Sequence, residues 1–117
     1  MSYKEKVTAM YNLMGQGKML DAFDKYYGEN VIMEEVGEDQ KAGKALNRAR
    51  EEQFLKAVED FHGMGVDAIT ADEDACITMV ETWMDASIAG MGRIFMKQVA
   101  VQKWEGDYIV HEKFYHK

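Results

Sequence analysis

Residues 93–116 read RIFMKQVAVQKWEGDYIVHEKFYH, and β-branched and aromatic residues dominate both halves of this stretch. Residues of these types favour strands over helices. Between the halves lies Glu105-Gly106-Asp107, which is a turn signal. The stretch therefore predicts two long antiparallel strands joined by a tight turn, and this hairpin organises the rest of the chain.

The length of the turn decides which residues of the hairpin face one another. A three-residue loop, which we prefer, places Ala100 opposite Glu112, whereas a two-residue loop shifts the pairing and places Glu112 beside Val101 and Val99. In the preferred register one face carries six residues: Gln98, Ala100, Gln102, Val110, Glu112 and Phe114. In either register Glu112 shares a face with apolar neighbours, and a carboxylate in that position needs a reason.

Composition limits the classes of protein and partner. The chain has 117 residues, 47% of them hydrophobic, which suits one domain over residues 1–117. The net charge of −7 and the absence of a Lys/Arg block argue against nucleic acid or membrane partners. Cys76 is the single cysteine, so no intrachain disulfide can form. With no signal peptide and no apolar stretch of about 18 residues, we expect a cytoplasmic protein.

Periodicity gives the order of elements. Apolar stripes predict helices over residues 3–14, 19–27 and 44–62, and alternation predicts strands over 31–36, 66–71 and 76–87 before the hairpin. Helices that precede a run of antiparallel strands are typical of an α+β fold. A strongly twisted sheet with three helices across its concave side forms a half-open cone, whose interior can hold a ligand.

Two polar residues of the long helix share a stripe with apolar ones. Asn47 and Glu51 lie one turn apart and line up with Phe54, Val58 and Phe61. This change from polar to apolar along one stripe is expected where a helix begins beside a cavity. The alternative is that the apolar stripe begins only at Phe54 and that the helix start is solvated.

The strand over 76–87 has no cleanly apolar face. Glu81, Trp83 and Asp85 alternate with Thr82 and Met84. Such a strand fits a sheet with a ligand cavity on one side and a subunit contact on the other, and Trp83 would then be a wall of the cavity. The alternative is that Trp83 belongs to the core and that Glu81 and Asp85 are exposed.

Sequence motifs exclude several chemistries. No spacing of His, Cys, Asp and Glu resembles a zinc site, and no phosphate loop, dinucleotide fingerprint or serine nucleophile elbow occurs. We therefore expect neither a metal nor a cofactor. Glu34-Glu35 ends the first predicted strand, where the period of two allows only one of these carboxylates to point inward.

Three stretches carry a family resemblance: AGKALNRAREEQFL (42–55), VETW (80–83) and MKQVAVQKWEGDYIVHEKFY (96–115). With the element order, they resemble the SnoaL-like branch of the nuclear transport factor 2-like superfamily, which also includes ketosteroid isomerases. The resemblance implies a conical α+β half-barrel with three N-terminal helices on a curved, mainly antiparallel sheet. It also implies a homodimer formed through the outer sheet face and a mostly apolar pocket.

In the isomerases, a tyrosine of the first helix and an acid of a late strand donate hydrogen bonds to a developing enolate, while an acid ending the first strand moves the proton. Tyr11 matches this tyrosine to within one position, and Glu34 or Glu35 falls near the base. Ala100 takes the place of the late-strand acid. Glu112 on the neighbouring strand is the residue that would supply a carboxyl.

We therefore expect a domain that binds an apolar, carbonyl-bearing small molecule and performs acid–base isomerase or cyclase chemistry. The alternative is a non-catalytic ligand-binding domain or a dimeric protein-interaction module with a filled interior. The expected catalytic residues are Glu112, Glu35 and Tyr11. The expected ligand contacts are Asn47, Glu51, Glu81, Trp83, Gln98 and Phe114. Apolar walls would raise the pKa of a carboxyl, and Tyr11, Asn47 or Gln98 would hold the carbonyl oxygen.

Overall fold

The computed structural model describes residues 1–116 of the chain. Within them lie three helices and six strands: α1 (Tyr3–Gly15), α2 (Met19–Tyr26), β1 (Tyr27–Glu35), β2 (Lys41–Ala42), α3 (Lys44–Ala57), β3 (Val58–Asp72), β4 (Ile77–Ile88), β5 (Gly92–Glu105) and β6 (Tyr108–His116). None of these helices is both long enough and apolar enough to span a membrane.

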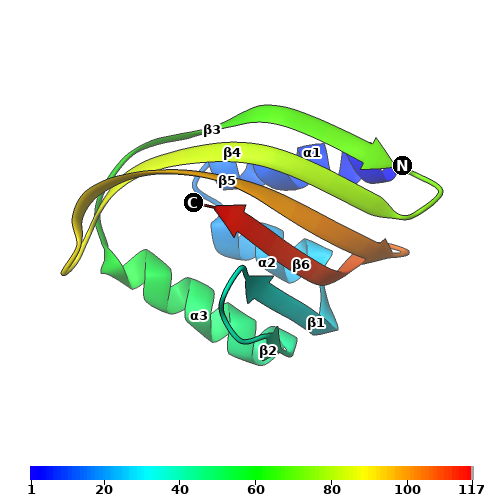
Figure 1. Cartoon of the computed structure of the whole chain (residues 1–117), viewed down its shortest axis with the longest axis horizontal. Helices are drawn as coiled ribbons and strands as arrows, with labels where there is room; N and C mark the ends of the chain where they lie inside the picture. Colours follow the sequence, from blue (N-terminus) through cyan, green and yellow to red (C-terminus); the bar gives the residue numbers. More distant parts are fainter. Residues whose placement is uncertain (117) are drawn as a thin grey trace.

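The described strands form one sheet in the order β2-β1-β6-β5-β4-β3. Every neighbouring pair is antiparallel except β1 and β6, which run parallel. Figure 1 shows the long strands β3, β4 and β5 bending over the helices, with α3 beneath the curved sheet. The predicted α+β architecture, with helices on a curved and mainly antiparallel sheet, is confirmed.

Two helix ends differ from the prediction. The second helix stops at Tyr26, and Tyr27 is already the first residue of β1. The third helix stops at Ala57 instead of His62, because the chain from Val58 onward pairs with β4 as an edge strand. Backbone pairing over the whole of β3 therefore overrides the helical spacing that Val58 and Phe61 continue.

The hairpin exists, but both predicted registers were wrong. The loop holds only Gly106 and Asp107, and a bulge follows where the pairing passes from Trp104 to Lys103. The bulge adds one residue to β6, so Glu112 lies opposite Gln102 instead of Ala100. Because the loop and the bulge together shift the pairing by two residues, the predicted sharing of a face by Gln102 and Glu112 still holds.

The core lies between α1, α2 and the sheet. Its apolar members include Val7, Met10, Phe23 and Ile109. Trp104 also belongs to this core and is 1% exposed. The Trp104 ring meets the edge of the Tyr26 ring with centroids 6.2 Å apart. This core fixes one end of the sheet and leaves the other end free to curve around a cavity.

Gly65→Ala tests the packing of β3 on β4. A Cβ at Gly65 would lie 2.4 Å from Trp83 Nε1, and the Trp83 ring is held by stacking on Phe95. We expect the free energy of unfolding to fall by about 1 to 3 kcal/mol in urea denaturation. Gly15→Ala is the matched control, since nothing lies within 4 Å of its added Cβ. Equal stability of the two variants would contradict the packing described here.

Candidate functional site

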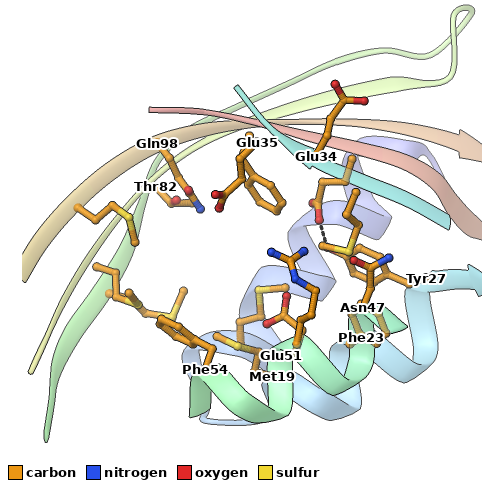
Figure 2. Close-up of a pocket in the computed structure, with 18 of the residues that line it drawn as sticks. Met19, Phe23, Tyr27, Glu34, Glu35, Asn47, Glu51, Phe54, Thr82 and Gln98 are labelled. Carbon is orange, nitrogen blue, oxygen red and sulfur yellow. Dashed lines mark hydrogen bonds between the residues drawn. The ribbon is translucent and has the colours of Figure 1, made fainter. Parts of the chain in front are cut away.

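A cavity of about 260 Å³ lies between the helices and the concave face of the sheet. Its apolar lining comes mainly from methionine and phenylalanine side chains: Met14, Met19, Phe23, Phe54, Met84 and Met96. Its polar lining includes Tyr11, Tyr27, Asn47, Glu51, Gln98 and Glu112. Figure 2 shows how Phe54 and Glu51 from α3 and Thr82 and Gln98 from the sheet surround this space.

Glu112 lies at the buried end of the cavity and is 0% exposed. Tyr27 Oη donates a hydrogen bond of 2.5 Å to Glu112 Oε1, drawn as a dashed line in Figure 2. Gln102 Nε2 donates a second bond of 2.8 Å to Glu112 Oε2. Both donors are neutral, and Glu112 forms no ion pair with any described residue.

Hydrogen bonds behind Glu112 connect Trp104, Thr78 and Gln102. An indole nitrogen can only donate, and Trp104 Nε1 donates to Thr78 Oγ1 over 2.9 Å. The Thr78 hydroxyl in turn donates to Gln102 Oε1 over 2.7 Å. The Gln102 amide is thereby oriented with its NH₂ group towards Glu112 and Tyr11.

Tyr11 offers a hydrogen-bond donor to the cavity. Its hydroxyl oxygen accepts a long bond of 3.4 Å from Gln102 Nε2. Its own proton has no acceptor among the residues that the structure describes, so it is available to a bound oxygen atom. Burial and the nearby Glu112 raise the pKa of Tyr11, which keeps the phenol protonated.

Desolvation is the largest cause of the raised pKa values of two cavity carboxyl groups, those of Glu112 and Glu51. Burial raises the pKa of Glu112 to about 7, against the opposing hydrogen bonds from Tyr27 and Gln102. Burial also raises the pKa of Glu51, which Arg50 lowers in part. Glu112 therefore carries a proton in roughly half of the molecules at neutral pH, where a carboxyl can both donate and accept a proton.

Asn47 presents an acceptor that has no partner. Its Nδ2 donates to the backbone carbonyls of Lys41 and Gly43, each over 2.9 Å, which fixes the amide orientation. The residue is 1% exposed, and its Oδ1 receives no hydrogen bond from any of residues 1–116. The alternative of a solvated helix start is thus wrong at Asn47, which borders the cavity as expected. Its NH₂ group is also committed, so Asn47 cannot hold a carbonyl oxygen as expected.

Of the two carboxylates that end β1, Glu35 points into the cavity and Glu34 points away, as Figure 2 shows. A hydrogen bond shared with Glu38, followed by burial, raises the pKa of Glu35. Glu34 accepts a bond of 2.7 Å from His111, which lowers the pKa of Glu34. The sequence allowed only one inward carboxylate, and Glu35 is that residue.

Eight of the nine residues expected at the site border the cavity: Tyr11, Glu35, Asn47, Glu51, Trp83, Gln98, Glu112 and Phe114. Glu81 does not, because it is exposed on the outer face of β4. Trp83 borders the cavity from β4, but strand alternation turns its ring to the outer face. There the ring covers Gly63 and Gly65 and stacks on Phe95, so Trp83 borders the cavity as expected while its ring packs on the sheet.

Sequence reasoning missed Tyr27 and Gln102 as site residues. Tyr27 continued the apolar stripe of the second helix, so no signal separated it from a core residue. Gln102 did carry a signal, since it shares a face with Glu112 in both the predicted and the observed pairing. Among residues 1–116, no cluster of three or more His, Cys, Asp or Glu side chains is arranged to hold a metal ion.

Comparison with known proteins gives one family. A family model for the SnoaL-like domain matches residues 1–116. A proposed SnoaL-like polyketide cyclase from Mesorhizobium loti superposes with a TM-score of 0.87 at 22% identity, over 99% of this chain and 100% of that chain. An LEH-like epoxide hydrolase from M. tuberculosis superposes with a TM-score of 0.78 at 19% identity, over 98% and 82%.

A proposed isomerase from Bacillus subtilis superposes with a TM-score of 0.82 at 16% identity, over 100% of this chain and 90% of that chain. The search of curated proteins found no significant match. At these identities the similarity to solved structures shows a shared fold. It does not show a shared reaction, since one fold hosts many chemistries.

Glu112→Gln should change how stability depends on pH. The folded-state pKa of Glu112 is about 7, above its ordinary value of 4.5, so the folded protein binds more protons between these values. The contribution is fully present below about pH 4.5 and is lost as pH rises through about 7. The variant lacks this loss, so its stability relative to the wild type should rise by about 3 kcal/mol from pH 5 to pH 8.

Urea denaturation at the two pH values measures this difference. Glu81→Gln is the control, because Glu81 is exposed and lies outside the cavity. A parallel pH dependence of the wild type and Glu112→Gln would contradict a raised pKa at Glu112.

Proposed function

Because the chain belongs to the SnoaL-like domain family, we propose that its cavity binds an apolar, carbonyl-bearing small molecule and that Glu112 exchanges a proton with it. The observation that carries this proposal is a fully buried carboxyl with a pKa of about 7 at the end of an apolar cavity. Groups with such shifted pKa values gather at functional sites.

The proposed reaction is an enolisation of the isomerase or cyclase type. The Glu112 carboxylate takes a proton from the carbon next to the carbonyl, the C–H electron pair becomes a C=C bond, and the C=O electron pair moves to oxygen. Tyr11 donates a hydrogen bond to that oxygen. Return of the proton from Glu112 to carbon completes the reaction with no net oxidation or reduction.

The surroundings of Glu112 support this role. A carboxylate offers about four lone-pair positions, and two of them are used by Tyr27 and Gln102. The remaining positions are free to accept a substrate proton. Glu35, Glu51, Gln98 and Phe114 also border the cavity, and we propose that they contact the ligand.

Hydrogen exchange of 2-tetralone in D₂O tests the reaction. We expect the wild-type protein to accelerate exchange of its α-hydrogens, followed by NMR. Glu112→Gln should abolish the acceleration while the ketone still binds, and Tyr11→Phe should reduce it by about 100-fold. Glu81→Gln should exchange at the wild-type rate. Binding without exchange in the wild type would instead support a non-catalytic ligand-binding domain.

A second proposal concerns the outer face of the sheet, which we propose is a homodimer interface. The apolar members of the outer face are Met79, Trp83, Phe95, Val99, Val101 and Tyr115, and Glu81, Asp85 and Lys97 lie on the same face. Strand pairing brings these residues together across β4, β5 and β6. Phe95 is 61% exposed and Met79 is 43% exposed in the single chain. Apolar surface of this kind favours association.

The cytoplasmic location expected from the sequence stays a prediction.

Sedimentation at micromolar concentration tests the dimer. The wild type should sediment as a dimer, and Phe95→Asp should sediment as a monomer because a carboxylate would be buried in the apolar contact. Leu46→Glu is the matched control, since Leu46 is 49% exposed on α3 and lies outside the outer face. A monomeric wild type would overturn this proposal.

A further inference from the structure

Carboxyl groups dominate the polar lining of the cavity. Six acidic side chains border it: Glu34, Glu35, Glu38, Asp39, Glu51 and Glu112. Arg50 is the single basic side chain among the described lining residues, and it is exposed. Outside the lining, His111 lies 2.7 Å and Lys113 lies 3.7 Å from Glu34, and His116 lies 3.8 Å from Glu35. Arg50 lowers the pKa values of Glu35, Glu38 and Glu51. Carboxyl groups therefore outnumber cationic side chains around the cavity, which disfavours a bound anion.

Asn47 supplies a second, independent observation. Both hydrogens of its amide are held by the carbonyls of Lys41 and Gly43, so the amide cannot flip to expose its nitrogen. Its buried Oδ1 therefore remains an acceptor, and it has no donor within the described residues. Figure 2 shows Asn47 beside Tyr27 at the closed end of the cavity. A buried acceptor in this state gains a hydrogen bond only from a molecule that donates one.

Tyr11 offers a hydrogen-bond donor, whereas Asn47 offers an acceptor. Gln102 already donates to its oxygen, and its own proton is free. The closed end of the cavity thus offers one donor, Tyr11, and one acceptor, Asn47. A ligand that satisfies both must carry an acceptor oxygen and also a hydroxyl or amine hydrogen.

From these features we infer that the ligand has an apolar body, carries a hydroxyl or amine donor for Asn47 besides its carbonyl oxygen, and bears no negative charge. This inference rests on the proposed function and specifies its substrate class. Hydroxy-ketones and amino-ketones fit it, whereas ligands whose polar group is a carboxylate, sulfate or phosphate do not. An anion beside Glu51 and Glu112 would lose its hydration in a buried space, and it would be repelled by whichever of these two carboxyl groups is ionised.

Calorimetric titration of the wild-type protein at pH 7 tests the inference. The probes are 2-tetralone and its derivatives with one hydroxyl, methoxy or carboxylate group at each position of the aromatic ring. At least one hydroxy isomer should bind about tenfold more tightly than its methoxy counterpart, because only the hydroxyl can donate to Asn47. The carboxylates should bind at least about tenfold more weakly than 2-tetralone at low salt.

Variants at the rim test the charge requirement separately. Glu38→Gln combined with Asp39→Asn should tighten binding of the carboxylate probes and leave the binding of neutral 2-tetralone nearly unchanged, because both residues are exposed and border the cavity. Glu59→Gln, an exposed residue of β3 outside the lining, should change neither.

The outcomes separate the two proposals. If 2-tetralone binds but every hydroxy isomer binds no better than its methoxy counterpart, or the carboxylates bind as well as 2-tetralone, this inference is overturned while the proposed function stands. If neither 2-tetralone nor any derivative binds, the proposed function fails together with this inference.

Discussion

The structure depends on the burial of one carboxyl group, that of Glu112, between two neutral donors. Removing a carboxylate from water is costly unless hydrogen bonds or a counter-charge compensate. Tyr27 and Gln102 supply hydrogen bonds, and no cation is paired with Glu112 among the described residues. A cation would have held the pKa of Glu112 low. Neutral donors leave desolvation as the larger effect, and the pKa lies at about 7.

The hydrophobic core and the site share a residue. Trp104 packs in the core against Tyr26, and its indole N–H begins the hydrogen bonds that pass through Thr78 to Gln102. The Gln102 amide is oriented by the bond that its Oε1 accepts from Thr78 and the bond that its Nε2 donates to Glu112. The bulge beside Trp104 also sets the register that brings Gln102 opposite Glu112. The fold therefore orients the site through backbone pairing and core packing together.

The sequence predicted which residues of the hairpin share a face, but it did not predict which residues pair across the two strands. Alternation placed Glu112 inward whatever the loop length, whereas the bulge near Trp104 has no signal in residue types alone. Tyr27 was missed because helical spacing continues through it. Glu81 was misplaced because both faces of β4 mix polar and apolar residues, so the pattern did not identify the inner face. Long-range pairing decided each of these cases.

Two features of the cavity lower the free energy of unfolding compared with an apolar core at the same positions. Asn47 Oδ1 is buried without a donor, and Glu112 must be desolvated. Replacing either side chain by an apolar one would remove that cost, yet Asn47 also holds the backbone at the start of α3. Departures from full polar satisfaction are expected where a protein binds or reacts. The two features lie at the same closed end of one cavity, and a ligand with a suitably placed donor would satisfy Asn47 in the bound state.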